Sequence, residues 1–90
     1  MASVEETLEN RGEVYGDYLG GTTLRSDIYN GILMRYAEVN DRQMDPVNAV
    51  MIFDIVNKLV RLSTTPDHLD TWLDIAGYAT LAKEALNEQD

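Results

Sequence analysis

The chain has 90 residues, no cysteine, one histidine and a net charge of −9 at pH 7. These values exclude disulfides and thiol chemistry, and they exclude a metal site built from several histidines of one chain. They also argue against direct nucleic-acid binding, which needs a basic surface to meet the phosphates. Because the hydrophobic fraction of 44% suits a globular protein, we expect one domain over residues 1–90.

The first part of the chain is expected to hold a short helix and a loop. Ser3 can cap a helix over residues 3–11, and Gly12 can end it. Residues 13–23 contain three glycines, which are typical of a loop with special backbone conformations. The loop candidates that could present backbone N–H groups to an anion are Tyr15, Gly16 and Asp17.

The rest of the chain repeats the helical spacing of apolar residues. The spacing predicts helices over about residues 24–40, 46–62 and 68–87. Asp45 as N-cap and Pro46 at the first helical position mark the clearest boundary. The helix that follows is apolar around most of its circumference and should be central. We therefore predict a compact, all-α, four-helix domain.

A homodimer is expected because an isolated core is marginal in a chain of this length. The expected contact surfaces are the last two predicted helices. In the final helix, Ala76, Gly77 and Ala79 form a patch of small residues where a second helix could approach closely. No membrane partner is expected, since the longest apolar run, Ala49–Phe53, is too short to span a bilayer. The first residues lack the features of a signal peptide, which predicts a cytoplasmic location.

A narrow polar strip on the helix over residues 46–62 is the first candidate site. Its members are Asp54, Asn57, Lys58 and Arg61. Lys58 and Arg61 could bind phosphate, with Arg61 offering a bidentate fork. Alternatively, the two cations form an intramolecular network with Asp54 and Asp74.

The acidic side of the last predicted helix is the second candidate site. Asp70 and Asp74 lie four residues apart and therefore project from one side of the helix. Two carboxylates at this spacing can share a divalent cation. The alternative is that Asp70 is solvated and Asp74 pairs with a basic group.

Three motifs together resemble a family of small uncharacterised phage and prophage domains. The motifs are the YGD at residues 15–17, the KLVRL at residues 58–62 and the DTWLDIAGYA at residues 70–79. The last motif is long and quite specific, and it supplies the aromatic candidates Trp72 and Tyr78. The resemblance covers about residues 8–86.

That family is in turn similar to the all-α nucleoside triphosphate pyrophosphohydrolases of the MazG type. The resemblance implies helical, usually oligomeric enzymes that use Mg²⁺ to hydrolyse (d)NTPs to the monophosphate and pyrophosphate. Their metal site combines E-x-x-E on one helix with E-x-x-D on the next. Asp74 stands at the position of the aspartate of E-x-x-D, but Thr71 stands at the position of the glutamate of that motif. Asp54 lies on the preceding helix, where Asn57 and Lys58 follow instead of a second acid. The Mg²⁺ ligand set is thus incomplete, and no cofactor is firmly implied.

The resemblance favours a phage-type protein that binds or hydrolyses a nucleotide in a degenerate MazG-like site, with turnover left open. Lys58 and Arg61 would hold phosphates, Asp70 and Asp74 would orient a cation or the basic pair, and the loop at Tyr15 would close the site. The alternative is a small acidic interaction protein that inhibits a host or defence enzyme. Such a protein would mimic nucleic acid toward a basic partner, and the net charge of −9 would be its working feature. Either protein would act in the host cytoplasm if it is phage-encoded.

Overall fold

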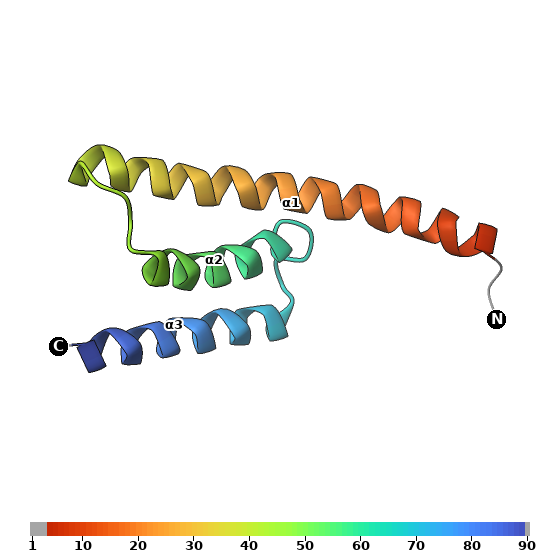
Figure 1. The fold of residues 1–90 in the computed structure, drawn as a ribbon. Helices are drawn as coiled ribbons and strands as arrows, with labels where there is room; N and C mark the ends of the chain where they lie inside the picture. Colours follow the sequence, from red (N-terminus) through yellow and green to blue (C-terminus); the bar gives the residue numbers. More distant parts are fainter. Residues whose placement is uncertain (1–3, 90) are drawn as a thin grey trace.

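The computed structural model contains three helices and, over the residues that it describes, no strand. It describes the backbone of residues 4–89 and the side chains of residues 18–88. The helices are α1 (Val4–Asn40), α2 (Pro46–Arg61) and α3 (Leu69–Gln89) (Figure 1). α2 lies between the other two helices and packs on both, whereas the described parts of α1 and α3 do not pack on each other. None of these helices combines the length and the hydropathy that a membrane span requires.

The break predicted at Gly12 and the loop predicted over residues 13–23 are wrong, because the helix predicted over residues 3–11 continues without a break as part of α1 for 37 residues. Over residues 4–89 there are therefore three helices instead of the four predicted. The glycines of the described part have no positive φ angle, so they follow helical backbone. A glycine inside a helix costs only about 0.5–1 kcal/mol relative to alanine, which packing can offset. Gly21 shows such packing, since a Cβ placed there would lie 3.8 Å from Cγ1 of Val60 on α2.

The two later helices follow the sequence pattern closely. α2 ends one residue before the predicted end, and α3 is displaced from its predicted bounds by at most two residues. The carboxylate of Asp45 accepts a hydrogen bond from the backbone N–H of Val47 at 2.8 Å, with Pro46 in the first turn. This is the predicted N-cap. α1 ends at Asn40, and the φ of 54° at the next residue, Asp41, turns the chain out of the helix.

The core within the chain is small, and the molecule is elongated instead of compact. The buried apolar residues of the described part are Ala49, Val56 and Val60, all on α2. The radius of gyration is 17.0 Å, whereas a compact domain of this length has a value of about 12 Å. At 1.5 Å per residue, α1 is about 55 Å long and α2 about 24 Å long. Much of α1 therefore extends beyond the helix on which it packs (Figure 1).

Candidate functional site

The polar strip of α2 is divided between the two neighbouring helices. Asn57 and Lys58 are consecutive, so they point about 100° apart around the helix axis. Asn57 Oδ1 accepts a hydrogen bond from Nη1 of Arg25 on α1 at 2.6 Å. Lys58 Nζ forms an ion pair with Oδ2 of Asp74 on α3 at 3.0 Å. We call these four residues, Arg25, Asn57, Lys58 and Asp74, the polar belt, because they link all three helices.

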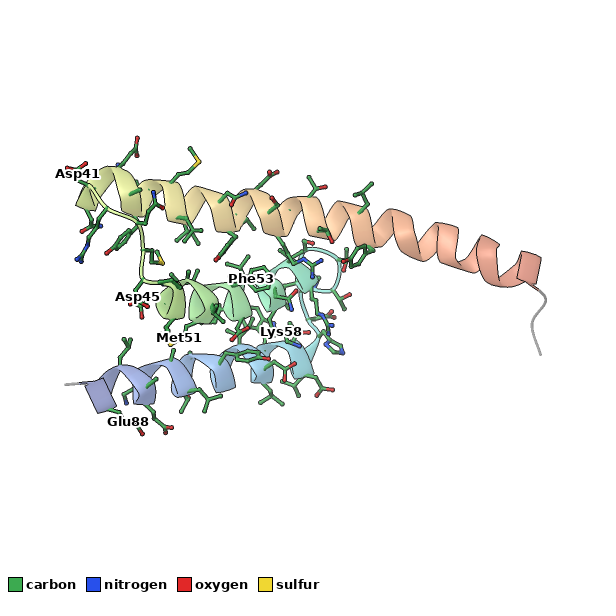
Figure 2. All side chains as sticks on the ribbon, in the orientation of Figure 1. Asp41, Asp45, Met51, Phe53, Lys58 and Glu88 are labelled. Atoms are coloured by element: carbon green, nitrogen blue, oxygen red, sulfur yellow. The ribbon has the colours of Figure 1, made fainter. Side chains whose placement is uncertain are left out.

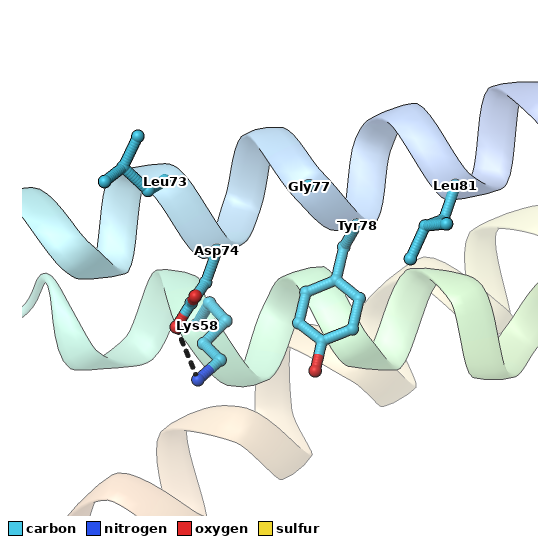
Figure 3. Close-up of a pocket in the computed structure, with 6 residues that line it drawn as sticks. All are labelled: Lys58, Leu73, Asp74, Gly77, Tyr78 and Leu81. Carbon is cyan, nitrogen blue, oxygen red and sulfur yellow. Dashed lines mark ion pairs between the residues drawn. The ribbon is translucent and has the colours of Figure 1, made fainter.

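The ion pair between Lys58 and Asp74 connects α2 to α3. It borders a hollow of about 350 Å³ that Tyr78 and Gly77 also line (Figure 3). The Lys58 side chain is only 16% exposed, whereas that of Asp74 is 48% exposed. A lysine so far removed from water needs a partner for its charge. The pair therefore acts first as a structural contact. Of the alternative network of Lys58 and Arg61 with Asp54 and Asp74, the described residues form this one ion pair.

A larger cleft, about 470 Å³ in volume, lies between α1 and α2. Its lining residues are Tyr18, Thr22, Arg25, Ser26, Tyr29, Asn30, Phe53 and Asn57. The guanidinium of Arg25 is held from two sides, by Asn57 and by Thr22 Oγ1, which accepts from Nη2 at 2.5 Å. It also lies 5.6 Å from the centroid of the Tyr18 ring. Arg25 is thus fixed in one orientation by neutral groups, and no carboxylate of residues 18–88 forms an ion pair with it.

Aromatic rings form another part of the same cleft. Tyr29 of α1 and Phe53 of α2 pack edge to face, with ring centroids 5.2 Å apart and an interplanar angle of 78°. Phe53 projects from α2 toward α1, whereas Met51 projects toward α3 (Figure 2). A fixed guanidinium beside aromatic rings can bind a phosphate and contact a planar group of the same ligand.

Arg61 lies apart from the polar belt. It lines a smaller pocket of about 210 Å³ at the connection between α2 and α3, with Thr64, Thr65, His68 and Thr71. Nδ1 of His68 and Oγ1 of Thr71 are 2.8 Å apart in this pocket. The structure therefore does not bring Lys58 and Arg61 together in one phosphate site, because Lys58 is directed to Asp74 instead.

The acidic candidates do not assemble into a metal site in the part of the chain with described side chains. Across that part, no group of three or more Asp, Glu, His or Cys residues is placed to hold a metal ion. Asp74 is directed to Lys58, Asp54 is half-buried on α2, and Asp70 is exposed on α3. These residues do not fit the Mg²⁺ that the MazG resemblance implies, since Mg²⁺ requires several oxygen ligands in octahedral geometry.

The remaining candidates are distributed over other parts of the structure. Tyr78 lines the hollow beside Lys58. Trp72 is half exposed, and its indole Nε1 donates a hydrogen bond to the carbonyl of Pro66 at 2.9 Å. The YGD motif at residues 15–17 lies within helix α1 instead of a loop, and its side chains are outside the described residues.

The sequence reasoning missed the importance of Arg25 and its aromatic neighbours. The loop predicted over residues 13–23 includes Tyr18 and Thr22, so it separated them from Arg25 and Tyr29 on the predicted helix over residues 24–40. In a continuous helix, Tyr18, Thr22, Arg25 and Tyr29 follow the spacing of one helix face. That spacing is the signal that could have identified the cleft.

The described structure defines a class of protein: an elongated three-helix protein with an arginine-centred cleft between its first two helices. The chain belongs to the family described as a domain of unknown function (DUF6378), whose model matches residues 1–86. A comparison with curated proteins gave no match, and neither did a comparison with solved structures. The family assignment agrees with the uncharacterised family expected from the motifs.

Proposed function

We propose that this protein binds a nucleotide in the cleft between α1 and α2. The observation that carries the proposal is the environment of Arg25, whose two hydrogen-bond acceptors, Asn57 and Thr22, are neutral. A guanidinium that is fixed but not neutralised keeps its charge for an anion, and its planar fork matches a phosphate. Tyr29 and Phe53 would contact the base or sugar.

The choice of a nucleotide over another phosphorylated ligand rests on the similarity of the phage and prophage domains, which the motifs resemble, to MazG-type enzymes. We propose a phage protein with a degenerate MazG-like site, in which binding is retained and hydrolysis is lost. Among residues 18–88, no set of carboxylates is placed to hold a metal ion, so a divalent cation at these residues would depend mainly on the phosphates of the ligand. Lys58 would support this site indirectly, through its neighbour Asn57.

A second candidate function is the acidic interaction protein, and the charge of α3 favours it. Asp70, Asp74, Glu84 and Glu88 give this helix an acidic surface that Lys83 only partly compensates. A basic host protein would bind such a surface with an affinity that decreases steeply as salt increases.

The deciding experiment is isothermal titration calorimetry with the common NTPs and dNTPs, with and without Mg²⁺. We expect binding of a subset of nucleotides, and the Arg25→Gln variant should bind at least about tenfold more weakly, since it loses a charge-assisted contact. Arg35→Gln is the matched control, because Arg35 is an exposed arginine of the same helix whose partner is Glu38. Its affinity should equal that of the wild type.

Two results would contradict the nucleotide proposal. Absence of binding at millimolar concentrations would remove it and favour the acidic interaction protein. An equal loss of affinity in Arg25→Gln and Arg35→Gln would show a general charge effect instead of a site at Arg25. The melting temperature of each variant without ligand shows whether the variant is folded, and therefore whether a weaker affinity results from unfolding.

A further inference from the structure

Helix α3 turns an apolar face away from the rest of the chain. Leu69, Trp72, Leu73 and Ala76 follow the i, i+3, i+4, i+7 spacing of a single helix face. Leu69 is 68% exposed and Leu73 60% exposed, and Leu73 points away from α2 (Figure 3). The opposite side of α3 faces α2, where Thr71 is buried. We call the four apolar residues the outer α3 face.

The surface area of the whole chain indicates how large a covering partner must be. The chain exposes 7162 Å², whereas a compact monomer of this size exposes about 5,300 Å². The excess of about 1,900 Å² falls within the roughly 1,000–2,500 Å² that each protomer of an obligate homodimer buries. The outer α3 face, with Leu69 and Leu73 more than half exposed, contributes to this excess.

Gly77, beside the outer α3 face, is not explained by packing within one chain. A Cβ placed at Gly77 would have no atom within 4 Å. Alanine would make the helix more stable, since glycine loses more backbone freedom on folding. Gly77 and the adjacent Ala76 do, however, allow a neighbouring helix to approach closely.

The chemistry of the face favours a second copy of the chain over a basic partner. A basic protein would be attracted to the carboxylates of this acidic chain, whereas the outer α3 face consists of uncharged side chains. A partner that buries this face must itself present an apolar surface. In a two-fold dimer the same face meets itself, so this requirement is fulfilled automatically.

We propose that two copies of this chain pack α3 against α3 through the outer α3 face, around a two-fold axis that passes near Ala76. Ala76 lies at the centre of the contact, and Trp72 and Leu73 pack beside it against the partner copy. This dimer does not depend on the nucleotide site, since the α1–α2 cleft lies on the other side of α2.

The first test is the mass in solution, measured by light scattering after size-exclusion chromatography without nucleotide. The wild type should have the mass of a dimer, and Leu73→Glu should shift it toward the monomer. Met34→Glu is the matched control, because Met34 is a 70% exposed apolar residue on α1, and its dimer should persist. A monomeric wild type at high micromolar concentration overturns the proposal.

The second test remains informative if Leu73→Glu fails to fold. Because the chain has no cysteine, Ala76→Cys introduces a single thiol close to the proposed two-fold axis. Mild oxidation should link most of this variant into covalent dimers, whereas Met34→Cys should stay mostly unlinked. Equal linking of both variants, or none in Ala76→Cys, rejects the outer α3 face as the interface.

Discussion

Asn57 and Lys58 are neighbours on α2, yet they connect this helix to opposite partners. Asn57 accepts a hydrogen bond from Arg25 of α1, and Lys58 pairs with Asp74 of α3. Each interface can therefore be altered by a substitution at one of two consecutive positions. This separation makes the structure testable, because stability and ligand binding should respond differently at the two positions.

Removal of the Asp74 carboxylate should lower the stability of the fold. In Asp74→Ala, the mostly buried ammonium of Lys58 loses its partner, so we expect the free energy of unfolding to fall by about 1–2 kcal/mol. The measurement is urea denaturation monitored by circular dichroism. Asp70→Ala is the control, because Asp70 is exposed, and its effect should stay within about 0.5 kcal/mol. Adding Lys58→Met to Asp74→Ala should recover part of the loss; no recovery would show that the unpaired charge is not its cause.

Substitution of Asn57 by aspartate should separate stability from binding. The new carboxylate would lie beside Arg25 and neutralise it, so Asn57→Asp should raise the free energy of unfolding by about 0.5–1 kcal/mol. The same neutralisation should weaken nucleotide binding at least about tenfold. Calorimetric titration and thermal denaturation of one preparation measure both effects. Unchanged nucleotide affinity in a correctly folded Asn57→Asp variant would count against Arg25 as the anion site.

The N-cap of α2 should make a measurable contribution to stability. Asp45→Ala removes the acceptor for the N–H of Val47, and the expected loss is about 1 kcal/mol. Asp45→Ser should retain most of the stability, since serine is an equally good cap. Thermal denaturation of the two variants compares them directly. Equal losses in both would indicate that the charge of Asp45, and not its capping bond, is what matters.

Two glycines of α1 should respond in opposite ways to larger residues. A Cβ at Gly31 would meet no atom within 4 Å, so Gly31→Ala should raise the free energy of unfolding by about 0.5–1 kcal/mol. Gly21 faces Val60, so Gly21→Leu should force α1 away from α2 and lower stability by about 1–3 kcal/mol. Gly20→Leu is the control for side-chain size, because its surroundings are open. Similar melting temperatures for the leucine variants at both positions would exclude a close α1–α2 contact at Gly21.

The sequence predicted the helical residues 24–40, 46–62 and 68–87 well and the loop over residues 13–23 wrongly, for physical reasons. Asp45 and Pro46 act locally, since a cap and a fixed φ angle specify a helix start without help from distant residues. The glycines of α1 do not decide between a loop and a helix. Their free-energy cost in a helix is small enough for tertiary contacts, such as that of Gly21 with Val60, to offset.

The candidate site shows the same limit of sequence reasoning. The polar strip on α2 was visible from its spacing, but spacing alone could not show that Asn57 meets Arg25 while Lys58 meets Asp74. That division depends on how α1 and α3 are arranged around α2. The metal candidate Asp70 depended on its spacing from Asp74, and Asp54 on the resemblance to MazG-type enzymes, and neither argument fixes the positions of side chains.

The lack of packing between the described parts of α1 and α3 has a consequence for how the protein folds. Each described helix packs only on the next one along the chain, and short connections join the helices, so most contacts lie within a helix and the contact order is low. Chains of this kind fold in microseconds to milliseconds. Either outer helix can also detach while the other remains bound to α2. Amide hydrogen exchange should therefore be slowest in α2, and the two outer helices should exchange as separate units.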